Sequence, residues 1–113
     1  MKHDARKYLF DALKCIEEIK SVAKDIKNAE ELKANLLWIR FVEREFEIIG
    51  EALNKYLKLE EDTKIREIKR IIGLRNLIIH SYDTVDYIML WQIIKNHLDN
   101  LEADIVDELN KLK

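Results

Sequence analysis

The sequence predicts an all-α fold, an up-down four-helix bundle with room for one additional short helix. The 113 residues include two glycines and no proline, whereas a β-rich chain of this size needs turn residues about every ten positions. Apolar residues make up 48% of the chain and recur at alternating spacings of three and four, as on one face of a helix. The length suits one hydrophobic core, so we expect residues 1–113 to form a single domain.

The first two predicted helices, residues 4–27 and 30–58, are separated by a break at Asn28-Ala29. Gly50 lies inside the second helix, where glycine costs about 1 kcal/mol relative to alanine. A close approach by another helix would explain that cost. The two predicted apolar stripes are Ala5, Leu9, Ala12, Ile16, Ile19, Ala23 and Ile26, then Leu32, Leu36, Ile39, Val42, Phe46, Ile49, Leu53 and Leu57.

Two further helices follow polar runs that contain good N-cap residues, 59–63 and Asp83-Thr84. In the third helix, Arg75 occupies a position that the period assigns to an apolar residue. Short connections between four amphipathic helices predict the up-down bundle. The two predicted stripes are Ile65, Ile68, Ile72 and Ile79, then Val85, Ile88, Trp91, Ile94, Leu98, Leu101, Ile105, Leu109 and Leu112.

The overall charge gives no general attraction to nucleic acid or to anionic membranes, because 20 basic residues face 22 acidic ones. Residues 64–80 nevertheless carry a local charge of +4. This segment is either a small polyanion-binding patch or a solvated helix face with ordinary ion pairs.

The sequence also predicts a cytoplasmic protein. The single cysteine, Cys15, falls in an apolar helical pattern and is expected to be a small buried residue in a reducing compartment. The amino-terminal residues contain no long apolar run, so we expect neither a signal peptide nor a membrane-spanning helix.

The stretch RNLIIHSY, residues 75–82, places an arginine and a histidine around an apolar run. On a continuous helix Arg75 and His80 lie ~7.5 Å apart along the axis and ~140° apart around it, so they do not share a face. If the helix ended near Ile79, His80 could turn toward Arg75. A dimer axis at this edge could instead bring two copies of each residue together.

Arg75 and His80 have the chemistry for cleaving RNA without a metal. Histidine, with an unperturbed pKa near ~6.5, can take a proton from a 2′-hydroxyl or give one to a leaving oxygen. Arginine can hold phosphate oxygens as negative charge develops, and Asn76 could orient either partner. A helix cap, a salt bridge or a buried polar pair would use the same residues, so the chemistry alone leaves both readings open.

RNLIIHSY, followed by DTVDY, resembles the R-x4-H-x-Y signature of the HEPN superfamily, in particular its HepT-like toxins. The stretch FEIIGEA, residues 46–52, resembles the second helix of that family. The opening Tyr8-Leu9-Phe10-Asp11 and the last predicted helix have compatible patterns, so the resemblance covers nearly the whole chain.

The resemblance implies a homodimer in which two R-x4-H motifs face each other, acting as a metal-independent RNase toxin with no cofactor. It implies that Arg75 and His80 are catalytic and that Asn76 supports them. Glu51 is either the family's acidic neighbour of the arginine or a member of a surface salt bridge. The resemblance also implies a partner, an MNT-type nucleotidyltransferase antitoxin that transfers AMP from ATP to Tyr82.

A second function class is compatible with the same residues. The chain could be a non-catalytic helical binding module that docks a nucleotidyltransferase and helps to bind its nucleotide or substrate. Arg75 and His80 would then hold a phosphate or shape the interface.

Overall fold

The computed structural model describes residues 2–81 and 85–112. This part of the chain contains six α-helices and no strand, which confirms the all-α prediction. None of the described helices combines the length and the apolar character that a membrane crossing requires. The helices are α1 (Lys2–Ala23), α2 (Ala29–Ala34), α3 (Leu36–Leu59), α4 (Ile68–His80), α5 (Tyr87–Asn96) and α6 (Leu98–Lys111).

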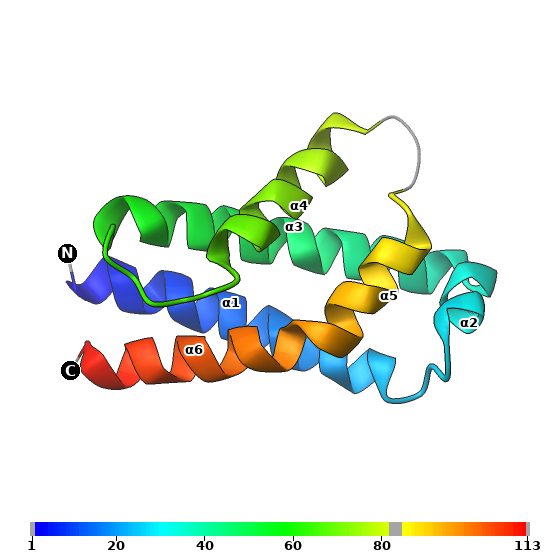
Figure 1. Cartoon of the computed structure of the whole chain (residues 1–113), viewed down its shortest axis with the longest axis horizontal. Helices are drawn as coiled ribbons and strands as arrows, with labels where there is room; N and C mark the ends of the chain where they lie inside the picture. The colour runs from blue at the N-terminus through cyan, green and yellow to red at the C-terminus, as the bar shows by residue number, and fades with distance from the viewer. Residues whose placement is uncertain (1, 82–84, 113) are drawn as a thin grey trace.

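Three long helices, α1, α3 and α6, lie side by side and form the body of the molecule (Figure 1). The short α2 lies at the far end of the molecule, where it contacts α3 and α5. Helix α4 packs along one side of α3 and then leans away from the body, and α5 returns toward α6. Helix α3 therefore lies between α1 on one side and α4 on the other.

The core follows the first predicted stripe closely, since all seven of its positions are buried: six lie in α1, and Ile26 follows the end of that helix. In α3 the predicted positions from Ile39 to Leu53 are buried as well. The third stripe is correct at Ile65 and Ile68, which are buried, and goes out of phase after them. The next buried residues of α4 are Ile71 and Leu74, while Ile72 is half-buried and Ile79 is exposed. Arg75 thus lies at the edge of the buried face and not at its centre.

Two of the four predicted helices are each divided in two. Asn35 has an extended backbone and its side-chain oxygen accepts a hydrogen bond from the N–H of Trp38 at 3.2 Å, so it begins α3 and ends α2. This break leaves Leu36, a predicted core residue, 58% exposed. The last predicted helix is divided at His97, which ends α5 and begins α6.

Candidate functional site

Gly50 on α3 allows α4 to approach α3 closely. A Cβ atom added to Gly50 would collide with the Cβ of Arg75 and would lie 2.9 Å from its Cγ and 3.2 Å from the carbonyl oxygen of Ile71. The expectation that a close helix contact explains this glycine is confirmed. The same contact fixes where the Arg75 side chain leaves α4.

The guanidinium of Arg75 is held by two hydrogen bonds. Its Nη2 donates to Glu51 Oε2 at 2.5 Å, across the α3–α4 interface, and its Nη1 donates to Asn76 Oδ1 at 3.0 Å. The side chain is 24% exposed, and its Nε is buried without an acceptor among the described residues. The structure therefore brings together three of the predicted site residues, Arg75, Asn76 and Glu51.

His80 lies on a different side of α4. The helix continues through His80, and Ser81 follows it with an extended backbone, so His80 does not turn back toward Arg75. No hydrogen bond or ion pair joins Arg75 to His80 within the described residues. His80 is exposed and lines an open hollow with Asn76, Leu77, Gly73 and Ser81. Asn76 thus accepts a hydrogen bond from Arg75 and also lines the hollow that contains His80.

Tyr82, the predicted site of modification, lies outside the described residues. After the gap, the N–H of Val85 donates to Oε2 of the buried Glu43 on α3 at 3.0 Å. Sequence reasoning missed this contact. Glu43 follows Ile39 by four residues and precedes Phe46 by three, so the helical period alone would have placed it on the buried face.

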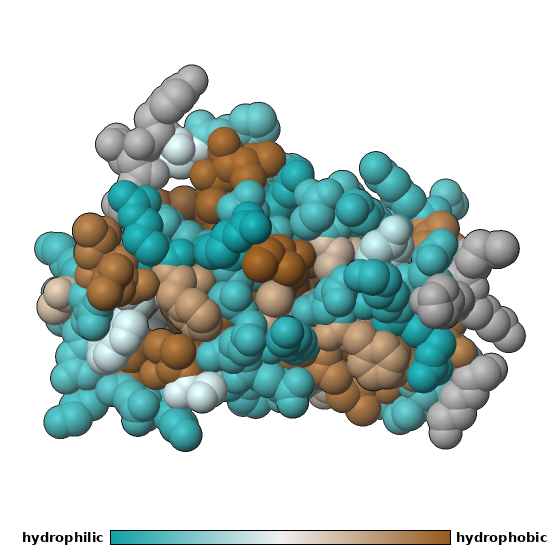
Figure 2. All heavy atoms as spheres, turned by 180° about the vertical axis from the view of Figure 1, so that it is seen from behind, coloured by the Kyte–Doolittle hydropathy of each residue, from teal (hydrophilic) through white to brown (hydrophobic). Residues whose placement is uncertain are grey.

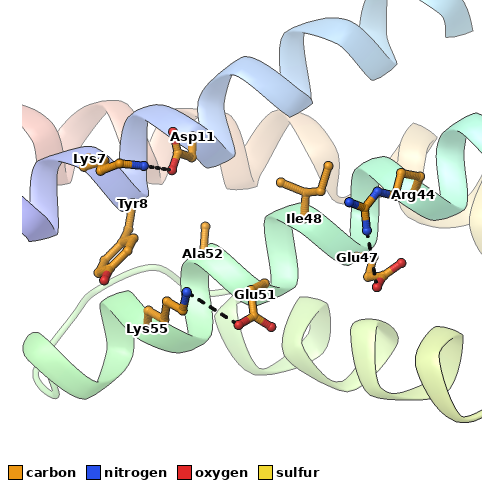
Figure 3. A pocket seen from close by; sticks show the side chains of 9 residues that line it. All are labelled: Lys7, Tyr8, Asp11, Arg44, Glu47, Ile48, Glu51, Ala52 and Lys55. Atoms are coloured by element: carbon orange, nitrogen blue, oxygen red, sulfur yellow. Dashed lines mark hydrogen bonds and ion pairs between the residues drawn. The ribbon is translucent and has the colours of Figure 1, made fainter.

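A groove of about 350 Å³ lies on the other side of α3, between α1 and α3 (Figure 3). Glu51 lines it and forms an ion pair there with Lys55 at 3.7 Å, so this carboxylate contacts both Lys55 and Arg75. Every basic side chain of the groove is paired with an acid, so the groove offers no free positive charge to a phosphate. The three pairs are Lys7–Asp11, Arg44–Glu47 and Lys55–Glu51.

Comparison with known proteins identifies the family. Residues 12–107 match the family described as "Ribonuclease HepT-like". The chain is 34% identical to "Putative RNase MJ1380" of Methanocaldococcus jannaschii, an alignment that covers 92% of this chain and 95% of that protein. It is 34% identical to "Putative RNase TTE0752" of Caldanaerobacter subterraneus subsp. tengcongensis, with 96% of each chain covered.

A third relative carries the family name itself. The chain is 31% identical to "Probable ribonuclease HepT" of Thermococcus cleftensis, over 91% of this chain and 94% of that protein. No solved structure matches significantly. The motif, the helical fold and these matches agree, and the chain belongs to the HepT-like ribonuclease family of the HEPN superfamily.

Proposed function

We propose that this chain is an endoribonuclease that acts as a homodimer, with Arg75 and His80 as its catalytic residues. The observation that carries the proposal is the fixed Arg75 side chain, held by Glu51 and Asn76 in an R-x4-H motif of a HepT-like chain. An arginine held in place beforehand can stabilise a phosphate in the transition state without reorganising first.

The proposed reaction uses the RNA itself as the nucleophile. The 2′-oxygen forms a bond to the adjacent phosphorus while the bond from phosphorus to the 5′-oxygen of the next nucleotide breaks. One histidine accepts the 2′-hydroxyl proton and another protonates the leaving 5′-oxygen. The products are a 2′,3′-cyclic phosphate and a 5′-hydroxyl. Because the RNA supplies the nucleophile and two histidines move the protons, this scheme uses no metal.

Arg75 keeps enough donors for a phosphate in this scheme. Arginine has five N–H groups, of which one binds Glu51, one binds Asn76 and the Nε–H is buried. Each terminal nitrogen therefore retains one N–H for a phosphate oxygen. Such charge-assisted bonds are about twice as strong as neutral ones.

A second copy of the chain would supply what one copy lacks. The reaction needs a base and an acid, and each chain offers one His80, which does not contact Arg75 of its own chain. Helix α4 is covered by α3 on one side, and apolar side chains are exposed at its projecting end (Figure 2). Leu77 is 52% exposed beside His80. We propose that a partner copy packs on this face of α4, so that the R-x4-H motifs of the two copies face each other.

We also propose that the chain is a cytoplasmic toxin, neutralised by an MNT-type nucleotidyltransferase that transfers AMP to Tyr82. An adenylyl group two residues from His80 would add bulk and a phosphodiester anion beside the site, repelling RNA. Co-expression with such a transferase should add the mass of one adenylate to the wild type. Tyr82→Phe should prevent this addition, whereas Tyr87→Phe, whose hydroxyl donates to Glu30 on α2, should not.

The separation of Arg75 and His80 within one chain also favours a second candidate function. A non-catalytic module that docks a nucleotidyltransferase would use Arg75 and His80 to hold a phosphate or shape an interface, with no need to bring them together. This module would bind the transferase stably and would leave RNA intact.

The two functions are separated by incubating the purified chain, in EDTA, with a single-stranded RNA and with the DNA of the same sequence. The ribonuclease should cut the RNA to 2′,3′-cyclic phosphate ends and leave the DNA whole, as mass spectrometry of the fragments would show. Intact RNA, or equal cutting of DNA, would remove the ribonuclease proposal and leave the binding module.

A further inference from the structure

Three carboxylates are buried among the described residues, and two of them are fully satisfied. Glu43 pairs with Arg40 at 3.5 Å and accepts the Val85 N–H. Glu108 accepts hydrogen bonds from the hydroxyls of Tyr56 and Thr63. Buried carboxylates of this kind are ordinary structural groups.

Glu45 is the exception. It is 7% exposed, its Oε2 is buried without a hydrogen-bond partner, and no ion pair reaches it within the described residues. A buried carboxylate normally pairs with a cation or binds a metal ion, because removing an unpaired charge from water is costly. Glu45 can therefore lose this charge in two ways, by holding a proton or by binding a cation.

Two other ligand-type side chains lie beside the Glu45 carboxylate, both from α1. The Cys15 sulfur, a Glu18 carboxylate oxygen and a Glu45 carboxylate oxygen lie within 4.8 Å of one another. Cys15 and Glu18 are three residues apart and so share one face of α1, while Glu45 comes from the facing helix α3. The cluster thus spans the α1–α3 interface.

We propose that Cys15, Glu18 and Glu45 form a site for a divalent transition-metal ion of the zinc type. One thiolate and two carboxylates are a borderline-soft ligand set that suits Zn²⁺ better than Mg²⁺ or Ca²⁺, which prefer oxygen ligands alone. Three protein ligands leave a fourth tetrahedral position for a water molecule. The ion would neutralise Glu45 and join α1 to α3.

The site is separate from the proposed catalytic residues. Glu45 faces α1, whereas Gly50 and Glu51 contact Arg75 on α4, the opposite neighbour of α3. The ion would therefore raise the stability of the α1–α3 pair and would not take part in RNA cleavage. Metal binding can be tested whatever the outcome of the ribonuclease assay.

The test is a titration of the metal-free full-length chain with Co²⁺, which occupies zinc sites and reports a thiolate ligand by a near-ultraviolet charge-transfer band. We expect one Co²⁺ per chain with this band in the wild type. Cys15→Ser should abolish the band, and Glu45→Gln should weaken binding at least about tenfold. Glu17→Gln, at an exposed position of the same helix, is the matched control and should bind as the wild type does.

A second measurement guards against variants that fold poorly. Zn²⁺ should raise the midpoint of thermal unfolding of the wild type and of Glu17→Gln, because a ligand that binds only the folded state stabilises it. Glu18→Gln and Glu45→Gln should lose most of that shift. A wild type without the thiolate band, or a band that persists in Cys15→Ser, overturns the proposal. So does an equal Zn²⁺-induced shift in all variants.

Discussion

Gly50 on α3 lies so close to Arg75 on α4 that a methyl group at residue 50 would occupy the space of the Arg75 Cβ. The contact involves the stem of Arg75 next to the backbone, which cannot move without moving α4 itself. The position of the arginine is therefore set by the packing of two helices and not by the side chain alone.

Gly50→Ala should destabilise the protein despite the higher helix propensity of alanine. Overpacking typically costs about 1–3 kcal/mol and the propensity gain returns about 1 kcal/mol, so we expect a net loss of up to about 2 kcal/mol in the free energy of unfolding. Urea denaturation measures it. Gly73→Ala is the control, because a Cβ there meets nothing within 4 Å, and it should gain about 0.5–1 kcal/mol. A stabilised Gly50→Ala variant would show that the two helices can separate freely.

Glu51→Gln should slow RNA cleavage while leaving the fold intact. The amide removes the charge that holds Arg75 Nη2, and misplacing a catalytic group lowers the rate, here by roughly tenfold. Because the pair is partly exposed, stability should change by less than about 1 kcal/mol. Glu47→Gln, one turn earlier in the same groove, should keep the wild-type kcat. Equal kcat values in the two variants would mean that Glu51 does not position the arginine.

Leu77→Asp should separate the proposed homodimer into monomers. The exposed leucine lies beside His80 on the uncovered face of α4, and a buried unpaired carboxylate is strongly unfavourable. Analytical ultracentrifugation reports the mass directly. Val106→Asp, at an exposed apolar position on α6, should remain dimeric. A dimer that survives Leu77→Asp would place the interface elsewhere.

The stability of the protein should fall as pH rises from about 4.5 to 7 in metal-free buffer. Burial and the neighbouring Glu18 raise the pKa of Glu45 to about 7, so between these values the folded state holds a proton that the unfolded state has released. The stabilisation from this proton is complete below the pKa of Glu45 in the unfolded state. It is lost as the pH rises through the pKa of Glu45 in the folded state. Since one pKa unit corresponds to about 1.36 kcal/mol, the shift from 4.5 to about 7 corresponds to a change on the order of 3 kcal/mol.

Glu45→Gln should flatten this pH dependence. The amide cannot titrate, whereas the surrounding groups Cys15, Glu18 and Lys14 remain in place. Thermal unfolding followed by circular dichroism at several pH values compares the two proteins. An unchanged slope in Glu45→Gln would assign the pH dependence to other groups.

The sequence predicted the helical class and the α1 core because both depend on local periodicity. Residues such as Leu9 and Ile16 follow the same helical spacing along the stripe. Sequence analysis missed the breaks at Asn35 and His97, because in both places the apolar spacing continues from one helix into the next. A cap such as Asn35 acts through its side-chain oxygen and its extended backbone, and hydrophobic periodicity registers neither.

The candidate site was predictable in part for a similar reason. The pairing of Gly50 with Arg75 could be anticipated from an unusual glycine and an arginine in an apolar stripe. The separation of Arg75 from His80 follows from helix geometry once α4 is known to continue to His80. What a second chain adds cannot be read from one sequence, because an isologous interface depends on the shape of a whole face.

The most direct test of the central claim is the rate of RNA cleavage by the wild type, Arg75→Ala and His80→Ala in the presence of EDTA. Lys69→Ala, which removes an exposed charge from the same helix, is the matched control. We predict that each motif variant loses at least about 100-fold in kcat, as expected when a general acid–base or a charge-stabilising group is removed, while Lys69→Ala changes it only a few-fold. Cleavage at the wild-type rate by His80→Ala or Arg75→Ala would contradict the assignment of this catalytic pair.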